Sequence, residues 1–169
     1  TMDVRLDPAT RMLSGSGVLT WRNITSMPAS EIRLHLYYNA WRDTRSSWMR
    51  ERLLAGNTEL ARRPVEDRGR IDVTAMRVMQ GGQTIDVHSR ITFIAPDDGN
   101  TDDRTVIEVP LDRPVAPGDT LDIEIGWTSK VPRTFARTGA IGDFFFIAQW
   151  FPKIGVLEDA GWNTHQFHS

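Results

Sequence analysis

Apolar and polar residues alternate most cleanly over the stretch Leu121-Asp122-Ile123-Glu124-Ile125-Gly126-Trp127. Successive side chains of a β-strand point to opposite faces, so this pattern predicts a strand with one face buried. The segments Met2–Asp7 and Glu31–Tyr37 alternate in the same way, and the second places three aliphatic residues on one face. The sequence therefore predicts several half-buried strands.

Residues that favour turns separate these strands at fairly regular spacing. Gly81-Gly82 predicts a hairpin turn, and Pro96–Asn100 and Val115–Thr120 are further clusters of turn-forming residues. Short strands joined by such turns are typical of an all-β sandwich. We therefore expect one all-β domain over residues 1–169, built mostly from antiparallel strands, with one short helix around residues 46–60.

Two of the expected strands contain irregular positions. Gly15 and Gly17 lie within the long strand Met12–Arg22, and they indicate a bulge or a close approach of the backbone to another group. The strand Arg70–Met79 does not alternate cleanly, which indicates a second bulge.

Composition excludes several classes of protein. The chain carries a net charge of -2 and its many Arg residues are mixed with Asp and Glu, so it lacks the basic stripe of a nucleic-acid-binding protein. No apolar run approaches the ~20 residues needed to cross a bilayer. Cys is absent, which excludes disulfides, thiolate metal sites and Cys nucleophiles in this segment.

The tract Asp143–Pro152 differs from the alternating strands because it is almost continuously apolar. Such a run is typical of a strand that is buried on both faces, or of one that another domain covers. The two interpretations differ in whether the covering surface belongs to this chain.

Two polar clusters could bind a metal ion. His165 and His168 form an H-x-x-H pair, but two ligands are not a site, and no Glu follows the first His as in the metalloprotease helix H-E-x-x-H. Acidic residues gather between Asp97 and Asp103, but their spacing does not match a calcium loop, and we favour an ordinary turn. The chain contains neither G-x-S-x-G nor a P-loop motif, so we assign it no catalytic residue and no metal site.

Aromatic residues around Trp41 and Trp48, with Tyr37 and Tyr38 nearby, leave two interpretations open. They could form a platform on which a sugar ring stacks, or they could fill the core of a sandwich or an interface. The sequence does not separate these two uses.

The sequence resembles the N-terminal domain of zinc aminopeptidases of the aminopeptidase N type, in their bacterial branch. The most specific part is Gln-Trp-Phe-Pro-Lys at residues 149–153, followed by Gly-Trp at residues 161–162. The segments that carry the resemblance are Val4–Asn23, Leu34–Trp41, Pro117–Leu121, Phe145–Val156 and Gly161–His168.

The resemblance implies a curved, saddle-like sheet domain that packs on a thermolysin-like catalytic domain. The catalytic domain of such enzymes binds zinc through His-Glu-x-x-His, and the zinc polarises the peptide carbonyl and activates water. That motif does not occur here, so we expect zinc only in the parent enzyme and no hydrolysis by this chain alone. We further expect the family domain to continue past residue 169, and the resemblance leaves a periplasmic, a secreted and a cytoplasmic location open.

The resemblance also implies residues that contact the substrate and the catalytic domain. In the family, a Gln or Glu of this domain accepts hydrogen bonds from the free α-amine of the peptide, and Gln149 is the best match for that residue. Asp143 is the competing candidate. The interface between the domains would then be packed by Phe145, Trp150, Phe151 and Pro152. We also expect the exposed apolar run to make the isolated chain self-associate.

Two alternatives remain beside this interpretation. The chain could be a stand-alone β-sandwich that binds a sugar or a protein, with Trp41, Trp48 and the two Tyr residues as its platform. It could also be a domain of an inactive homologue that lacks the zinc motif. A His-Glu-x-x-His sequence downstream of residue 169 would favour the aminopeptidase.

Overall fold

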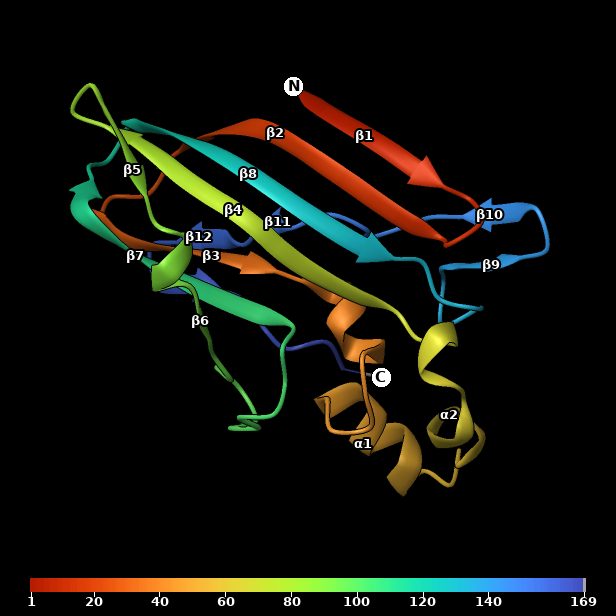
Figure 1. The fold of residues 1–169 in the computed structure, drawn as a ribbon. Coiled ribbons are helices and arrows are strands. Elements are labelled where there is room, and N and C mark those ends of the chain that lie inside the picture. Colours follow the sequence, from red (N-terminus) through yellow and green to blue (C-terminus); the bar gives the residue numbers. More distant parts are fainter. Residues whose placement is uncertain (169) are drawn as a thin grey trace.

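The computed structural model describes residues 1–168, which form an all-β domain of two main antiparallel sheets (Figure 1). The larger sheet has the strand order β1-β2-β8-β4-β5, and the smaller has the order β11-β3-β7-β6. The strands of the larger sheet are β1 Met2–Asp7, β2 Met12–Arg22, β8 Thr120–Lys130, β4 Arg70–Gln80 and β5 Gln83–Asp86. Those of the smaller sheet are β11 Lys153–Ile154, β3 Ala29–His35, β7 Val106–Val115 and β6 Thr92–Phe93.

Strand β8 lies at the centre of the larger sheet, between β2 and β4. Its alternate residues Leu121, Ile123, Ile125 and Trp127 are all buried, which confirms the half-buried strand predicted from the alternating pattern. They join one core cluster with residues of β3, β4 and β7, so the two sheets enclose a shared apolar core. The predicted sandwich of mostly antiparallel strands is therefore present.

The irregular positions in β2 and β4 have different causes. The pairing of β4 with β8 shifts register between Val73 and Ala75, which confirms the predicted bulge. The strand β2 pairs with β8 without a shift, so a bulge at Gly15 is wrong. A side chain at Gly15 would overlap the indole of Trp127, and the glycine therefore permits the close approach that was the other interpretation.

Short helices cover one end of the sandwich (Figure 1). They are η1 Tyr37–Trp41, α1 Ser47–Leu54, α2 Glu59–Arg62 and η2 Val65–Asp67, whereas η3 His88–Arg90 lies apart from them, in the chain between β5 and β6. Helix α1 begins after Ser46, whose side-chain oxygen accepts a hydrogen bond from the backbone N–H of Met49 at 3.3 Å. The predicted helix around residues 46–60 is thus confirmed, although Gly56 and its neighbours divide it into α1 and α2.

The chain after β8 forms small hairpins rather than long strands. Strands β9 Gly139–Ile141 and β10 Phe144–Phe146 pair with each other, as do β12 Val156–Glu158 and β13 Gly161–Asn163. Of the two interpretations of Asp143–Pro152, a strand that is buried on both faces within this chain is wrong. Only its first third is a strand, which pairs on one side with β9 alone and leaves Phe144 and Phe146 exposed.

Candidate functional site

An exposed apolar surface lies on the hairpin of β9 and β10, residues Gly139–Phe146, which we call the aromatic hairpin. Ile141, Phe144 and Phe146 are 66%, 68% and 58% exposed. Phe145 lies between the two exposed Phe residues and points to the other face, where it packs on a small core cluster with Leu13. The alternation of a two-stranded hairpin therefore fixes which aromatic rings face outward.

A cavity of about 200 Å³ lies between the aromatic hairpin and the loop that precedes it. Phe144 and Phe146 line it together with Arg137. In that loop Thr134 and Ala136 have φ values of 33° and 44°, a backbone conformation that is costly for residues other than glycine. The surface is therefore hollowed beside exposed aromatic rings and contains a positively charged side chain.

The loop is held in this conformation by its buried residues. Phe135 is 1% exposed, and its backbone N–H and C=O exchange hydrogen bonds of 2.9 Å with Thr138. The guanidinium of Arg63 lies over the Phe135 ring, 4.5 Å from its centre. The Thr138 hydroxyl is 2.8 Å from the Tyr38 hydroxyl and donates to the Phe146 carbonyl at 3.0 Å, so it ties the loop to the hairpin.

Gln149 follows the aromatic hairpin in a left-handed backbone conformation, with φ at 57°. The backbone is fixed on both sides, since the N–H of Ala148 donates to the Thr138 hydroxyl at 3.2 Å and the carbonyl of Trp150 accepts from Ser129 at 2.6 Å. The side-chain amide oxygen of Gln149 is buried and has no hydrogen-bond partner within the described residues. Gln149 therefore does not use that oxygen to satisfy a backbone group within the described residues.

The other predicted interface and substrate residues lie in different surroundings. Asp143 is exposed at the tip of the aromatic hairpin, and β10 separates it from Gln149. Pro152 is buried within the chain. Trp150 and Phe151 are half-buried and pack on each other with ring centres 5.2 Å apart, and Trp150 also contacts Trp127.

The most exposed large apolar residues in this region are Ile141, Phe144 and Phe146. The run Phe144–Phe151 predicts an exposed apolar patch, which includes Phe144 and Phe146, but the packing at the domain interface was assigned to Phe145, and Ile141 was not named. The sequence did contain a signal for this exposure. Phe144 and Phe146 are two residues apart, and alternate residues of a strand share a face, so both rings lie on the face opposite to that of Phe145.

Of the two interpretations of the aromatic residues around Trp41 and Trp48, the core of the sandwich is correct and the platform for a sugar is wrong. Trp41 is 0% exposed, Trp48 is 4% exposed and Tyr38 is 0% exposed, so these rings belong to the core. Tyr37 is half-buried and stacks on His35, with ring centres 4.8 Å apart.

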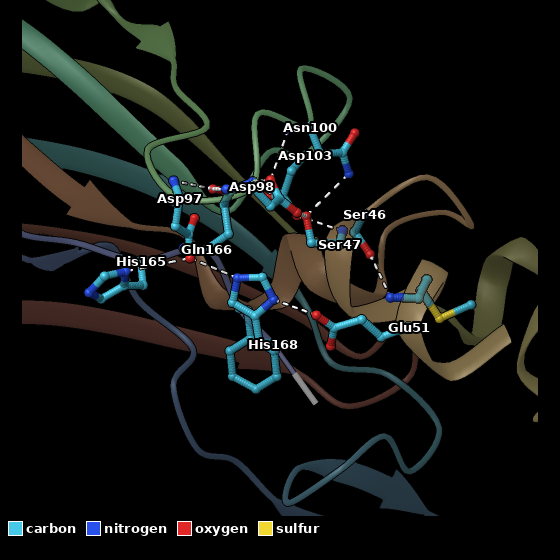
Figure 2. Close-up of polar contacts among 12 residues, drawn as sticks. Ser46, Ser47, Glu51, Asp97, Asp98, Asn100, Asp103, His165, Gln166 and His168 are labelled. Carbon is cyan, nitrogen blue, oxygen red and sulfur yellow. Dashed lines mark hydrogen bonds and ion pairs between the residues drawn. The ribbon is translucent and has the colours of Figure 1, made fainter. Parts of the chain in front are cut away.

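The two polar clusters singled out in the sequence meet in space (Figure 2). One carboxylate oxygen of Asp97 lies 2.7 Å from His168 and 3.5 Å from His165. Within the described residues, no group of three or more His, Cys, Asp or Glu side chains has a geometry that could hold a metal ion. Asp103 accepts a hydrogen bond from the backbone N–H of Thr105 at 2.7 Å, which confirms the interpretation of the acidic segment as a turn.

The fold and these features define the chain as an all-β domain of two antiparallel sheets with an exposed aromatic hairpin. No family model matches the sequence, and no curated protein matches it. Among solved structures, a family IIIa CBD from Clostridium cellulolyticum matches with a TM-score of 0.36 and 11% sequence identity, over 98% of this chain and 95% of that chain. A likeness at this level supports no inference about function. Across residues 1–168, none of the helices has the length and apolar character needed to span a membrane.

Proposed function

We propose that this chain is a non-catalytic β domain that binds another protein through the aromatic hairpin. The observation that carries this proposal is the joint exposure of Ile141, Phe144 and Phe146 on one small hairpin. Contiguous exposed apolar residues of this kind mark protein interaction surfaces. Complete burial of such a side chain contributes ~1.5–3 kcal/mol, so three of them can anchor an interface.

The resemblance to aminopeptidase N-type enzymes suggests the partner. It is the zinc-binding catalytic domain of the same enzyme, and this chain forms one wall of its substrate cleft. The hairpin and Gln149 lie within or beside the Gln-Trp-Phe-Pro-Lys segment on which that resemblance depends most. In this arrangement the zinc and the hydrolytic residues belong entirely to the partner domain.

The role of Gln149 is to accept a hydrogen bond from the free α-amine of a peptide. A buried amide oxygen without a partner is costly, and an ammonium group, a strong donor, removes this cost once the Gln149 side chain turns outward to meet it. The left-handed backbone at Gln149, held by Thr138 and Ser129, fixes the position of this residue before the peptide binds. Recognition of the amine restricts cleavage to the first residue of the peptide.

A stand-alone protein-binding module is the second candidate. The cavity of about 200 Å³ beside Phe144 and Phe146 favours it, because such a hollow accepts an apolar side chain from any partner. This candidate requires neither zinc nor a peptide amine.

A comparison of peptidase activity between the complete polypeptide that the gene encodes and the 169-residue chain tests the proposal. We expect the complete polypeptide to release N-terminal residues from peptides in a zinc-dependent reaction, whereas the 169-residue chain alone has no such activity with or without zinc. Gln149→Ala is expected to lower kcat/KM by roughly 10- to 100-fold, since hydrogen bonds to charged groups contribute about 1.5–3 kcal/mol.

Gln149→Glu serves as the matched variant, since it retains an oxygen acceptor and is expected to keep more activity than Gln149→Ala. Turnover of an aminoacyl anilide by the chain alone would refute the proposal. A complete polypeptide without peptidase activity that still binds a protein through the aromatic hairpin would instead establish the second candidate.

A further inference from the structure

The segment Thr164–His168 lies against the loop that connects β6 and β7 (Figure 2). The backbone N–H of Gln166 donates to a carboxylate oxygen of Asp97 at 3.2 Å, and the side-chain oxygen of Gln166 accepts from the Asp97 backbone at 3.2 Å. The backbone N–H of Phe167 donates to the Thr105 hydroxyl at 3.3 Å. These contacts place the segment at a fixed position on the loop.

The same loop holds the start of α1. The backbone N–H of Ser47 donates to Asp103 at 2.9 Å, and the hydroxyl of Ser47 donates to Asp98. The side-chain amide of Asn100 donates to the carbonyl of Arg45 at 2.8 Å. The loop, the first turn of α1 and the segment Thr164–His168 therefore form one polar network.

His168 completes this network by contacting two carboxylates from different elements. Its Nδ1 lies 2.5 Å from Oε1 of Glu51 in α1, and its Nε2 lies 2.7 Å from Oδ2 of Asp97 in the loop. An ionised carboxylate only accepts hydrogen bonds, and a neutral imidazole has a single N–H. Both contacts are hydrogen bonds at the same time only when His168 carries both protons.

We propose that His168 is a pH-sensitive latch: its imidazolium joins the carboxylates of Glu51 and Asp97 and holds the segment Thr164–His168 against α1, and loss of a proton releases the segment. This inference concerns a site apart from the aromatic hairpin and does not depend on the proposed function.

The charges around His168 favour its protonated form. Glu51 faces it from α1, Asp97 and Asp98 face it from the loop, and His165 lies on its own segment beside Asp97. The hydrogen bond to Glu51, supported by Asp97, raises the pKa of His168 above its usual 6.5 against the opposing effect of burial. Burial acts to raise the pKa of Asp97, but hydrogen bonds from the Gln166 backbone and from His168 outweigh it and lower the pKa below 3.8.

These directions define the pH range in which the latch is closed. The contribution of His168 is complete below pH 6.5, its pKa in the unfolded chain, and disappears as the pH rises through the higher pKa of the folded protein. The contribution of Asp97 is complete above pH 3.8 and disappears as the pH falls through its lower pKa in the folded protein. The contribution of His168 is therefore fully present below pH 6.5, and the latch opens on the alkaline side as the pH rises through the pKa of the folded protein.

A first experiment follows the imidazole resonances of the purified chain by NMR as the pH is raised. We expect the midpoint of His168 to lie above 6.5, and Glu51→Gln and Asp97→Asn each to lower it. A midpoint at or below 6.5, or one that neither variant changes, would overturn the proposal.

A second experiment measures amide hydrogen exchange of residues 164–168 and of α1 at pH 6 and pH 8.5, corrected for intrinsic exchange rates. Protection is expected to fall on the order of threefold at the higher pH, because ion pairs near the surface are weak. His168→Gln should abolish this pH dependence, and His165→Gln should retain it because the His165 side chain is 68% exposed. An equal pH dependence in His168→Gln and the unchanged chain would refute the latch.

Discussion

Strand β8 and the aromatic hairpin are both rich in apolar residues, but the protein uses them in opposite ways. Strand β8 has a neighbour on each side, and a second sheet covers the face that carries Ile123 and Trp127. Strand β10 pairs only with β9, and Phe144 and Phe146 remain exposed. The difference teaches that burial depends on the layer opposite a strand face, and that apolar content alone does not predict it.

The largest effect is expected in β8. Ile123 is 0% exposed, so Ile123→Ala removes buried methyl groups and leaves a cavity, which should lower the free energy of unfolding by about 2–5 kcal/mol. Glu124→Ala is the matched control on the exposed face of the same strand and should leave stability nearly unchanged. Chemical denaturation measures both. Equal losses in the two variants would show that β8 is not half-buried.

A smaller effect on stability is expected in the aromatic hairpin, where replacing two neighbouring residues should have different consequences. Phe145 packs on the cluster around Leu13, so Phe145→Ala should cost about 1–3 kcal/mol, less than a fully buried Phe. Phe144→Ala should change stability by no more than roughly 0.5 kcal/mol, because its ring is 68% exposed. Thermal or denaturant unfolding measures the stability of the two variants. A larger loss of stability in Phe144→Ala than in Phe145→Ala would mean that Phe144, and not Phe145, lies on the buried face of β10.

Replacing the two exposed rings of the aromatic hairpin should have the smallest effect on stability but a clear effect on self-association of the chain. The exposed rings predict that the isolated chain self-associates at high concentration, as the apolar tract already suggested. The double variant Phe144→Ser with Phe146→Ser should reduce the mass measured by light scattering without unfolding the chain. If the unchanged chain stays monomeric at high concentration, the aromatic hairpin does not mediate the self-association that we infer.

Most of the framework could be predicted from local patterns. Alternation identified β3 and β8, turn residues separated the strands, and Gly15 indicated the close approach that the Trp127 indole makes. These features depend on residues close together in the sequence or on rules that hold for every strand.

The parts that could not be predicted depend on residues far apart in the chain. Glu51, Asp97 and His168 meet only because α1, a loop and the segment Thr164–His168 pack together, so the H-x-x-H pair by itself did not indicate these contacts. In the same way, the exposure of Phe144 depends on the absence of a layer opposite the outer face of β9 and β10 within residues 1–168.

The reactivity of a thiol at position 144 tests the docking surface most directly. The chain contains no Cys, so Phe144→Cys introduces a unique label site, and Leu54→Cys provides a control at a residue that is 89% exposed. We expect position 144 to react rapidly in the isolated chain and at least about tenfold more slowly in the complete polypeptide, with position 54 unchanged. Equal reactivity of position 144 in both proteins would contradict the proposal that the aromatic hairpin is a docking surface.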